Sequence, residues 1–296
     1  MSDIRKILLP LAGTRNGEAA LATGLNLARR FNAHLSVMHV RSDSREVAPL
    51  AGEGLSGAMV EEMMTAAERE ATRRSLKVRE VFDRLVAESG IAVRGAPPLP
   101  GPGGAHAEAP TTSFQTLTGR EHEVVSYAAR LSDLTVVPHA VSGEEVSSSE
   151  ALHAVLFDSG RPVVIAPKTS PATVGRRVCV AWNGTGESAS AVLSILPWIK
   201  QAEAVQVLHS PDYQRHGPEA GLLLDYLALH GVRADTRMFR AVDKEVGAGL
   251  LAACTDFGAD MIGMGAYSHS RLRQLILGGV TRHVLENAAL TVLMAR

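Results

Sequence analysis

The chain has little cysteine, no long hydrophobic run and almost no net charge, and each shortage excludes a class of protein. Its only cysteines, Cys179 and Cys254, both stand in apolar patterns, so we expect core thiols rather than a redox or metal pair. The net charge of -1 gives no electrostatic bias toward nucleic acid or an anionic membrane. No apolar run approaches the about 18 residues of a membrane span, and none reads as a signal peptide, so we expect a cytoplasmic protein.

Several motifs that carry chemistry in other proteins are also missing. No lysine follows a glycine, which excludes a Walker A phosphate loop, and no serine stands in a Gly-x-Ser-x-Gly elbow. The histidines form no His-x-x-x-His pair, and no cysteine lies nearby to complete a tetrahedral metal set. The usual carriers of hydrolase and zinc chemistry are therefore absent from the sequence.

What the sequence does contain is an internal repeat. Four pairs of segments fall in register: 6–14 on 177–185, 34–39 on 204–209, 133–138 on 260–265, and 163–166 on 292–295. A duplicated chain of this length predicts two domains, each large enough to bury its own core. We place them at residues 1–170 and 171–296, with the boundary in the linker at 168–175.

Short apolar runs alternate with segments of helical spacing in both halves. The runs lie at 7–11, 35–40, 114–117, 134–137 and 163–166, and again at 178–181, 205–208, 236–239, 261–264 and 291–294. Continuous apolar runs are typical of strands buried on both faces, as in parallel sheets. The sequence therefore predicts an α/β fold of two tandem Rossmann-like domains, each a five-stranded parallel sheet flanked by helices. We expect the domains to pack as an intramolecular pseudo-dimer through their last strands, 163–166 and 292–295, and leave a homodimer open.

The first half is longer, and its excess lies in residues 45–112, to which the sequence assigns no role. Residues 58–89 have the spacing of one long helix or two successive helices. Val78, Phe82 and Leu85 form a buried stripe there, so we interpret the charges around them as a solvated face rather than a docking surface.

The two halves differ most after their fourth strands. In the second half Gly265 opens a loop, residues 266–277, that ends at Gly278 and Gly279, and residues 280–287 then have helical spacing. Backbone N–H groups and the positive end of a helix dipole would converge at the carboxyl edge of the sheet, an arrangement that suits phosphate. Thr281 could add a hydroxyl donor or simply cap the helix. The first half offers no such loop, so we expect one site rather than two.

The first strand of the second half ends at the same edge, at Ala181, Trp182 and Asn183. The Asn183 side chain could bond to a ribose hydroxyl, or it could cap the helix that starts near Gly186, and the residues leave both readings open. Trp182 is expected to be a packing residue beside a base pocket. Further along, Asp243 is predicted to cap a helix that stops near Gly258.

The order of these features resembles the universal stress protein family in a tandem form. The resemblance covers nearly the whole chain and is strongest in the second half. In that family the nucleotide loop reads Gly, two residues, Gly, nine residues, Gly, then Ser or Thr. Here the spacing is kept, but Ser268 stands at the second Gly and Gly279 at the hydroxyl position. The resemblance implies ATP binding that these two changes weaken, with at most slow hydrolysis and no clear pair of carboxylates for Mg²⁺.

The resemblance also implies a set of site residues. Ala181, Trp182 and Asn183 would border adenine and ribose, Ser210 would touch the base through its backbone, Met264, Gly265, Ser268, Gly278, Gly279 and Val280 would surround the phosphates, and Thr281 or His269 would supply the missing donor. Asn183 replaces the usual aspartate of the family and so loses a negative charge. The function expected is therefore that of an adenine-nucleotide-binding module without nucleic-acid or membrane partners. The alternatives are a stress-induced scaffold that binds no nucleotide, and an adenylyl transferase, for which no substrate-activating motif is recognisable.

Overall fold

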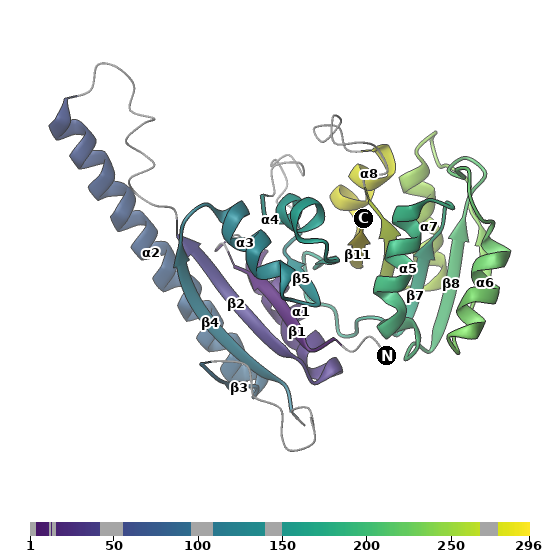
Figure 1. Cartoon of the computed structure of the whole chain (residues 1–296), viewed down its shortest axis with the longest axis horizontal. Helices are drawn as coiled ribbons and strands as arrows, with labels where there is room; N and C mark the ends of the chain where they lie inside the picture. The colour runs from purple at the N-terminus through teal and green to yellow at the C-terminus, as the bar shows by residue number, and fades with distance from the viewer. Residues whose placement is uncertain are drawn as a thin grey trace.

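In the computed structural model, the described residues form one continuous eleven-stranded sheet with helices on both faces (Figure 1). These residues are 4–11, 13, 16–41, 56–95, 109–139, 150–266 and 278–296. The strand order is β3-β4-β2-β1-β5-β6-β11-β10-β7-β8-β9. The N-terminal half contributes β1 to β6 and the C-terminal half β7 to β11.

The elements of the N-terminal half are β1 (Lys6–Pro10), α1 (Gly17–Phe31), β2 (His34–Arg41), α2 (Gly57–Ser89), β3 (Ala92–Val93), β4 (Thr111–Thr118), α3 (Glu121–Arg130), β5 (Leu134–Val137), α4 (Glu150–Ala154), the π-helical turn η4 (Val155–Ser159) and β6 (Val163–Ile165). Those of the C-terminal half are β7 (Arg177–Ala181), α5 (Gly186–Ile199), β8 (Ala204–His209), α6 (Ala220–Leu229), β9 (Asp235–Met238), α7 (Val246–Phe257), β10 (Met261–Gly265), α8 (Gly279–Asn287) and β11 (Thr291–Ala295). The predicted α/β class is confirmed, and each predicted strand is present with bounds shifted by a few residues at most. The two-residue β3, which the sequence did not predict, extends the N-terminal edge.

All strand pairs within each half are parallel, whereas the two halves join in the opposite sense. Strand β11 pairs antiparallel with β6, with Val292 opposite Ile165 and Met294 opposite Val163. The sequence predicted that the halves would meet through these last strands, and the structure confirms that contact. Apart from β3, the two halves have the same strand order, and this pairing joins them into one continuous sheet.

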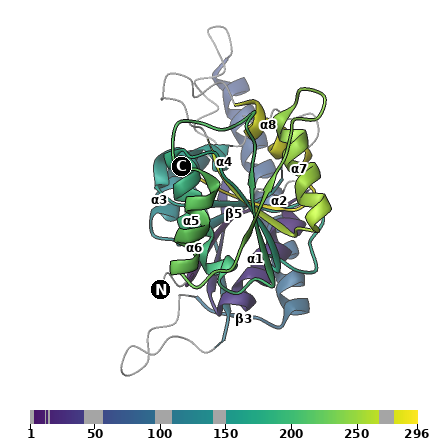
Figure 2. The same cartoon turned by 90° about the vertical axis from the view of Figure 1, so that its right-hand side faces the viewer.

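The core consists of two apolar layers, one on each face of the sheet. Neighbouring strand residues point to opposite faces, so Ile7 and Leu9 lie in one layer and Leu8 in the other. Helices α1, α2, α5 and α6 cover the first layer, and α3, α4, α7 and α8 cover the second. Figure 2 shows α5 and α6 on one side of the C-terminal half and α7 and α8 on the other. Both cysteines are buried in the second layer, and a hydrogen bond to Cys179, together with burial, raises the pKa of Cys254, so these are core thiols.

Asp133, directly before β5, and Asp260, directly before β10, make matching contacts, so the two halves repeat in structure as well as in sequence. Asp133 accepts hydrogen bonds from the backbone N–H groups of Arg5 (2.7 Å) and Lys6 (2.8 Å). Asp260 accepts from the N–H groups of Arg176 and Arg177, both at 3.1 Å. Each carboxylate therefore fixes the beginning of its neighbouring first strand at the amino edge of the sheet.

Asp260 also holds the linker between the halves. It accepts two further hydrogen bonds, from the Thr173 hydroxyl (2.7 Å) and the Gly175 N–H (3.0 Å). Gly175 has φ +79°, and a Cβ there would lie 2.4 Å from the Trp198 ring, so both backbone and space require glycine. The Trp198 ring in turn meets the ring of Phe31 edge-on, with centroids 5.0 Å apart, which packs α1 of one half against α5 of the other.

In the described part of the insertion, residues 57–89 form one continuous helix, α2, rather than two successive helices. It begins at Ser56, whose side chain accepts from the Met59 N–H, and ends at Gly90 in the left-handed conformation with φ 68°. Glu70 and Arg74 form an ion pair along the helix at 3.8 Å. Arg84 pairs with Glu18 of α1 at 2.8 Å, which ties the helix to the body of the molecule.

Two capping expectations are wrong. Helix α7 has Glu245, not Asp243, at its N-cap position, because Asp243 (φ 51°) and Lys244 (φ 66°) form a tight turn closed by mutual backbone hydrogen bonds of Val242 and Glu245. Asn183 does not cap α5 either. The cap is Thr185, whose hydroxyl accepts from the Ser188 N–H. The helix bounds themselves, with α7 stopping at Gly258 and α5 starting at Gly186, agree with the sequence.

Candidate functional site

The carboxyl ends of β7 and β10 form the topological switch point of the C-terminal half. These strands are parallel neighbours, but the chain leaves β7 for α5 on one face and passes from β10 toward α8 on the other. Connections that part in opposite directions leave a crevice at the strand ends, where open α/β sheets bind their ligands.

The first turn of α8 presents backbone amides at this edge. Gly278 is the N-cap residue and makes no side-chain cap, and the turn that follows contains no acidic residue. No described residue accepts a hydrogen bond from the N–H groups of Gly279, Val280 or Thr281. A Cβ placed at Gly278 or Gly279 would meet no described atom within 4 Å. The positive end of the helix dipole is therefore uncompensated within the described residues.

Thr281 lies inside this first turn rather than before it. Because the N-cap is Gly278, the alternative that Thr281 caps the helix is excluded by the structure. Its side chain is buried. Ser268 and His269, the other predicted donors, lie outside the described residues, as does the first-half segment 140–149 that would correspond to the loop.

Gly265 has a packing reason to be glycine. A Cβ there would lie 2.6 Å from the Ser188 nitrogen and the Glu187 carbonyl carbon, so the strand end touches the first turn of α5 directly. Met264, the residue before it, is buried. Thus β10 brings its end close to the beginning of α5, and the missing Cβ makes room for that helix.

At the end of β7, alternate residues point to opposite faces. Ala181 belongs to the apolar layer of α7 and α8, whereas Trp182 belongs to that of α5 and α6. The Trp182 ring N–H donates to the Pro218 carbonyl at 2.8 Å, and the ring lines a groove of about 400 Å³ together with Leu193 and Leu222. The expected packing role of Trp182 is confirmed, and its ring lies on the opposite face of the sheet from α8.

Asn183 is buried and its polar atoms are engaged by the protein. Its side-chain oxygen accepts from the N–H (3.2 Å) and hydroxyl (3.0 Å) of Thr185, and its carbonyl accepts from the Arg215 N–H at 2.9 Å. It thereby orients the residue that caps α5. Tyr213 also hydrogen-bonds to the Asn183 side chain, which partly opposes the rise that burial causes in the pKa of the Tyr213 hydroxyl.

Residues 210–218, which we call the covering segment, fold over the end of β7. The carbonyl of buried Ser210 accepts from the N–H groups of Tyr213 (3.0 Å) and Gln214 (2.8 Å). A Cβ on Gly217 would lie 2.0 Å from the Gly184 carbonyl oxygen, so the two backbones touch. Sequence reasoning missed Tyr213, Arg215 and Gly217, because no local pattern shows that a loop after β8 returns to β7. The ribose and base side of the predicted site is therefore filled by the protein's own groups, whereas the α8 side is open among the described atoms.

The described residues supply no preformed metal site. Within the ranges given above, no three His, Cys, Asp or Glu side chains gather closely enough to hold an ion. Across the same ranges, none of the helices combines the length and hydrophobicity needed to cross a membrane.

Comparison with known protein families identifies the family of the C-terminal half, which contains the carboxyl edge described above. Residues 177–296 match the model of the universal stress protein family. The C-terminal half is a universal stress protein domain. The match begins at the first residue of β7 and includes the covering segment and α8. The resemblance predicted from the sequence is thus confirmed.

Solved structures extend the likeness in fold to the whole chain. A universal stress protein from Archaeoglobus fulgidus DSM 4304 has a TM-score of 0.64 at 15% identity, with 98% of each chain covered. A functionally unknown protein from Pseudomonas aeruginosa PAO1 has a TM-score of 0.53 at 13% identity and covers 99% of this chain and 92% of its own. A universal stress protein in complex with cAMP has a TM-score of 0.32 at 14% identity and covers 57% and 100%. No curated protein sequence matches the chain.

Proposed function

We propose that the universal stress protein domain binds an adenine nucleotide, with its phosphates at the first turn of α8. The observation that supports this most is the uncompensated first turn. The N–H groups of Gly279, Val280 and Thr281 have no acceptor among the described residues, and no carboxylate in the turn repels an anion. A helix N-terminus at the carboxyl edge of a parallel sheet offers phosphate both hydrogen-bond donors and a favourable dipole.

The ribose and base would lie toward Ala181, Asn183 and Ser210, under the covering segment. Space for them requires that this segment moves, because Asn183 bonds to Thr185, Arg215 and Tyr213. Those hydrogen bonds must be broken or replaced when the base enters, which lowers the net contribution of base and ribose to affinity. The phosphates should therefore contribute most of the binding free energy.

Calorimetry with ATP, ADP, AMP and inorganic triphosphate tests the proposal. We expect affinity to fall from ATP to ADP to AMP, and triphosphate to bind within about tenfold of ATP, since each 1.4 kcal/mol corresponds to a factor of ten. Gly278→Val places a side chain where no described atom lies, so it should weaken ATP and triphosphate at least about tenfold without loss of stability. Gly221→Val in α6, where a Cβ also meets no described atom within 4 Å, is the matched control.

Two outcomes contradict the proposal. Absence of binding by both ATP and triphosphate at millimolar concentration would leave the scaffold function as the better account. Binding that Gly278→Val leaves unchanged would place the anion elsewhere. Because the described residues hold no cluster of ligands for a metal, we expect ATP turnover to be slow at most.

A further inference from the structure

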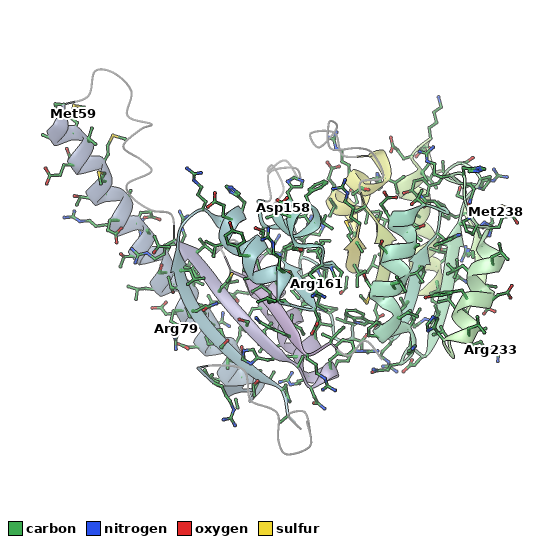
Figure 3. All side chains as sticks on the ribbon, in the orientation of Figure 1. Met59, Arg79, Asp158, Arg161, Arg233 and Met238 are labelled. Carbon is green, nitrogen blue, oxygen red and sulfur yellow. The ribbon has the colours of Figure 1, made fainter. Side chains whose placement is uncertain are left out.

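Helix α2 is much longer than the part of it that packs on the sheet. Its buried residues, Val78, Phe82 and Val86, all lie in its C-terminal half. No residue of 57–77, which we call the projecting segment, belongs to either apolar layer. Figure 1 shows the N-terminal part of this helix extending beyond the ends of the strands, and Arg41 at the end of β2 pairs with Glu68, where the helix reaches the sheet. Figure 3 places Met59 at the far end of the helix and Arg79 where it runs beside the sheet.

The projecting segment carries an apolar stripe. Val60, Met64, Ala67 and Ala71 follow one another at intervals of four, three and four residues. At about 100° per residue they share the helix face of Val78, so the stripe continues the buried face past the sheet. These intervals average about 3.7 residues, close to the 3.6 residues of one helical turn, so the stripe stays on one face of the helix, as in an amphipathic helix that packs against a partner. Beside the stripe, Met59 and Met63 are 50% and 40% exposed.

Charge is divided sharply along the same stretch. Residues 57–68 contain three acidic residues, Glu61, Glu62 and Glu68, and no basic residue. Residues 69–79 contain five basic residues, Arg69, Arg73, Arg74, Lys77 and Arg79, and one acidic residue, Glu70. Glu61 and Glu62 form no ion pair with any described residue. Two such helices laid parallel would place like charges together, whereas two laid antiparallel would place the acidic part of each on the basic part of the other.

We propose that the projecting segment pairs antiparallel with the projecting segment of a second copy of this chain. The stripe supplies the apolar seam, its two alanines allow the backbones to approach closely, and the divided charge sets the direction. This contact is independent of the nucleotide site and of the β6–β11 join within the chain. The charge pattern of α2 in the sequence favours a solvated face. The proposal instead assigns the charged residues of the projecting segment to an interface between two copies of the chain.

Sedimentation velocity of the full chain from low to high micromolar concentration tests this pairing. We expect a concentration-dependent dimer that weakens when salt is raised, because exposed charge pairs are screened. The double variant E61K/E62K gives both parts of the projecting segment a net positive charge, and R73E/R74E gives the segment a net negative charge. Each should weaken the dimer about tenfold or more, and an equimolar mixture of the two should restore it as a heterodimer. E80K/E88K, which makes the same charge change nearer the body, is the control.

Circular dichroism of each variant checks that α2 remains helical. A chain that is monomeric over the whole concentration range overturns the proposal. A dimer that neither double variant weakens also overturns it, since the interface then lies elsewhere. A mixture that stays monomeric while each variant is helical overturns the antiparallel direction. A dimer weakened by Met64→Glu as well would confirm that the apolar stripe forms the seam.

Discussion

The two halves share their amino edge and differ at their carboxyl edge. At the amino edge, Asp133 and Asp260 make the same contacts to the start of the first strand in each half. At the carboxyl edge, the first-half sequence has Leu11 where the second half has Trp182, and it has no counterpart of the glycine doublet before α8. The duplication therefore kept the contacts that specify the fold and changed the edge where such sheets bind ligands.

The largest expected difference between the halves comes from these aspartates. Asp260→Ala should cost about 3 kcal/mol of unfolding free energy, because it removes the acceptor of four hydrogen bonds, and Asp133→Ala about half as much, because it removes the acceptor of two. Urea unfolding followed by circular dichroism measures both. Equal losses would mean that the linker contacts of Asp260 add nothing.

Acid should weaken the N-terminal half first, because it contains all three of the described histidines whose pKa is lowered. Burial is the main cause for His34, His39 and His153, with Lys6 adding to it for His34 and Arg74 and Arg41 for His39, while the Leu11 carbonyl opposes it. A histidine whose folded pKa is lowered stabilises the fold above its unfolded pKa of about 6.5, and that stability is lost as the pH falls toward the folded pKa.

Hydrogen exchange at pH 7 and pH 5 should therefore show amides of β1 and β2 losing more protection than those of β7 and β8, after correction for the intrinsic rate. His39→Gln, which keeps a polar partner for the Leu11 carbonyl, should reduce the pH dependence in β1 and β2. Equal acid sensitivity of both halves would contradict this prediction.

A smaller loss of stability is expected from substitution of Trp182, whose counterpart in the repeat is Leu11. Trp182→Phe keeps an aromatic ring but removes the donor to Pro218, so it should cost about 1 kcal/mol. The loss should be concentrated in the covering segment, with faster hydrogen exchange at the Arg215 amide. A loss spread evenly over the sheet would show that the indole stabilises the core and does not anchor the segment.

The strands could be predicted well from the sequence, because parallel strands buried on both faces consist of short apolar runs. The sequence also predicted the β6–β11 contact, since the repeat made both strands the last of their halves. It failed at Asp243, where two consecutive residues of positive φ form a turn that no propensity favours, and it did not predict β3, which is too short to show a pattern.

The candidate site was predicted in part. Glycines before a helix are visible in a sequence, so the start of α8 was located to within one residue. The covering segment was not, because its contacts join Gly184 to Gly217 and Asn183 to Arg215, across a strand and a helix. Such long-range backbone contacts leave no periodic signal. For the same reason the sequence could place Asn183 at the edge but could not show that its side chain already bonds to Thr185.

The most direct test of the central claim is an NMR titration of ¹⁵N-labelled protein with inorganic triphosphate, followed at the backbone amides. The account predicts that the signals of Gly279, Val280 and Thr281 shift first and most, while amides of the N-terminal half around Leu11 and Gly17 stay in place. Shifts confined to other residues, or none at millimolar triphosphate, would contradict it.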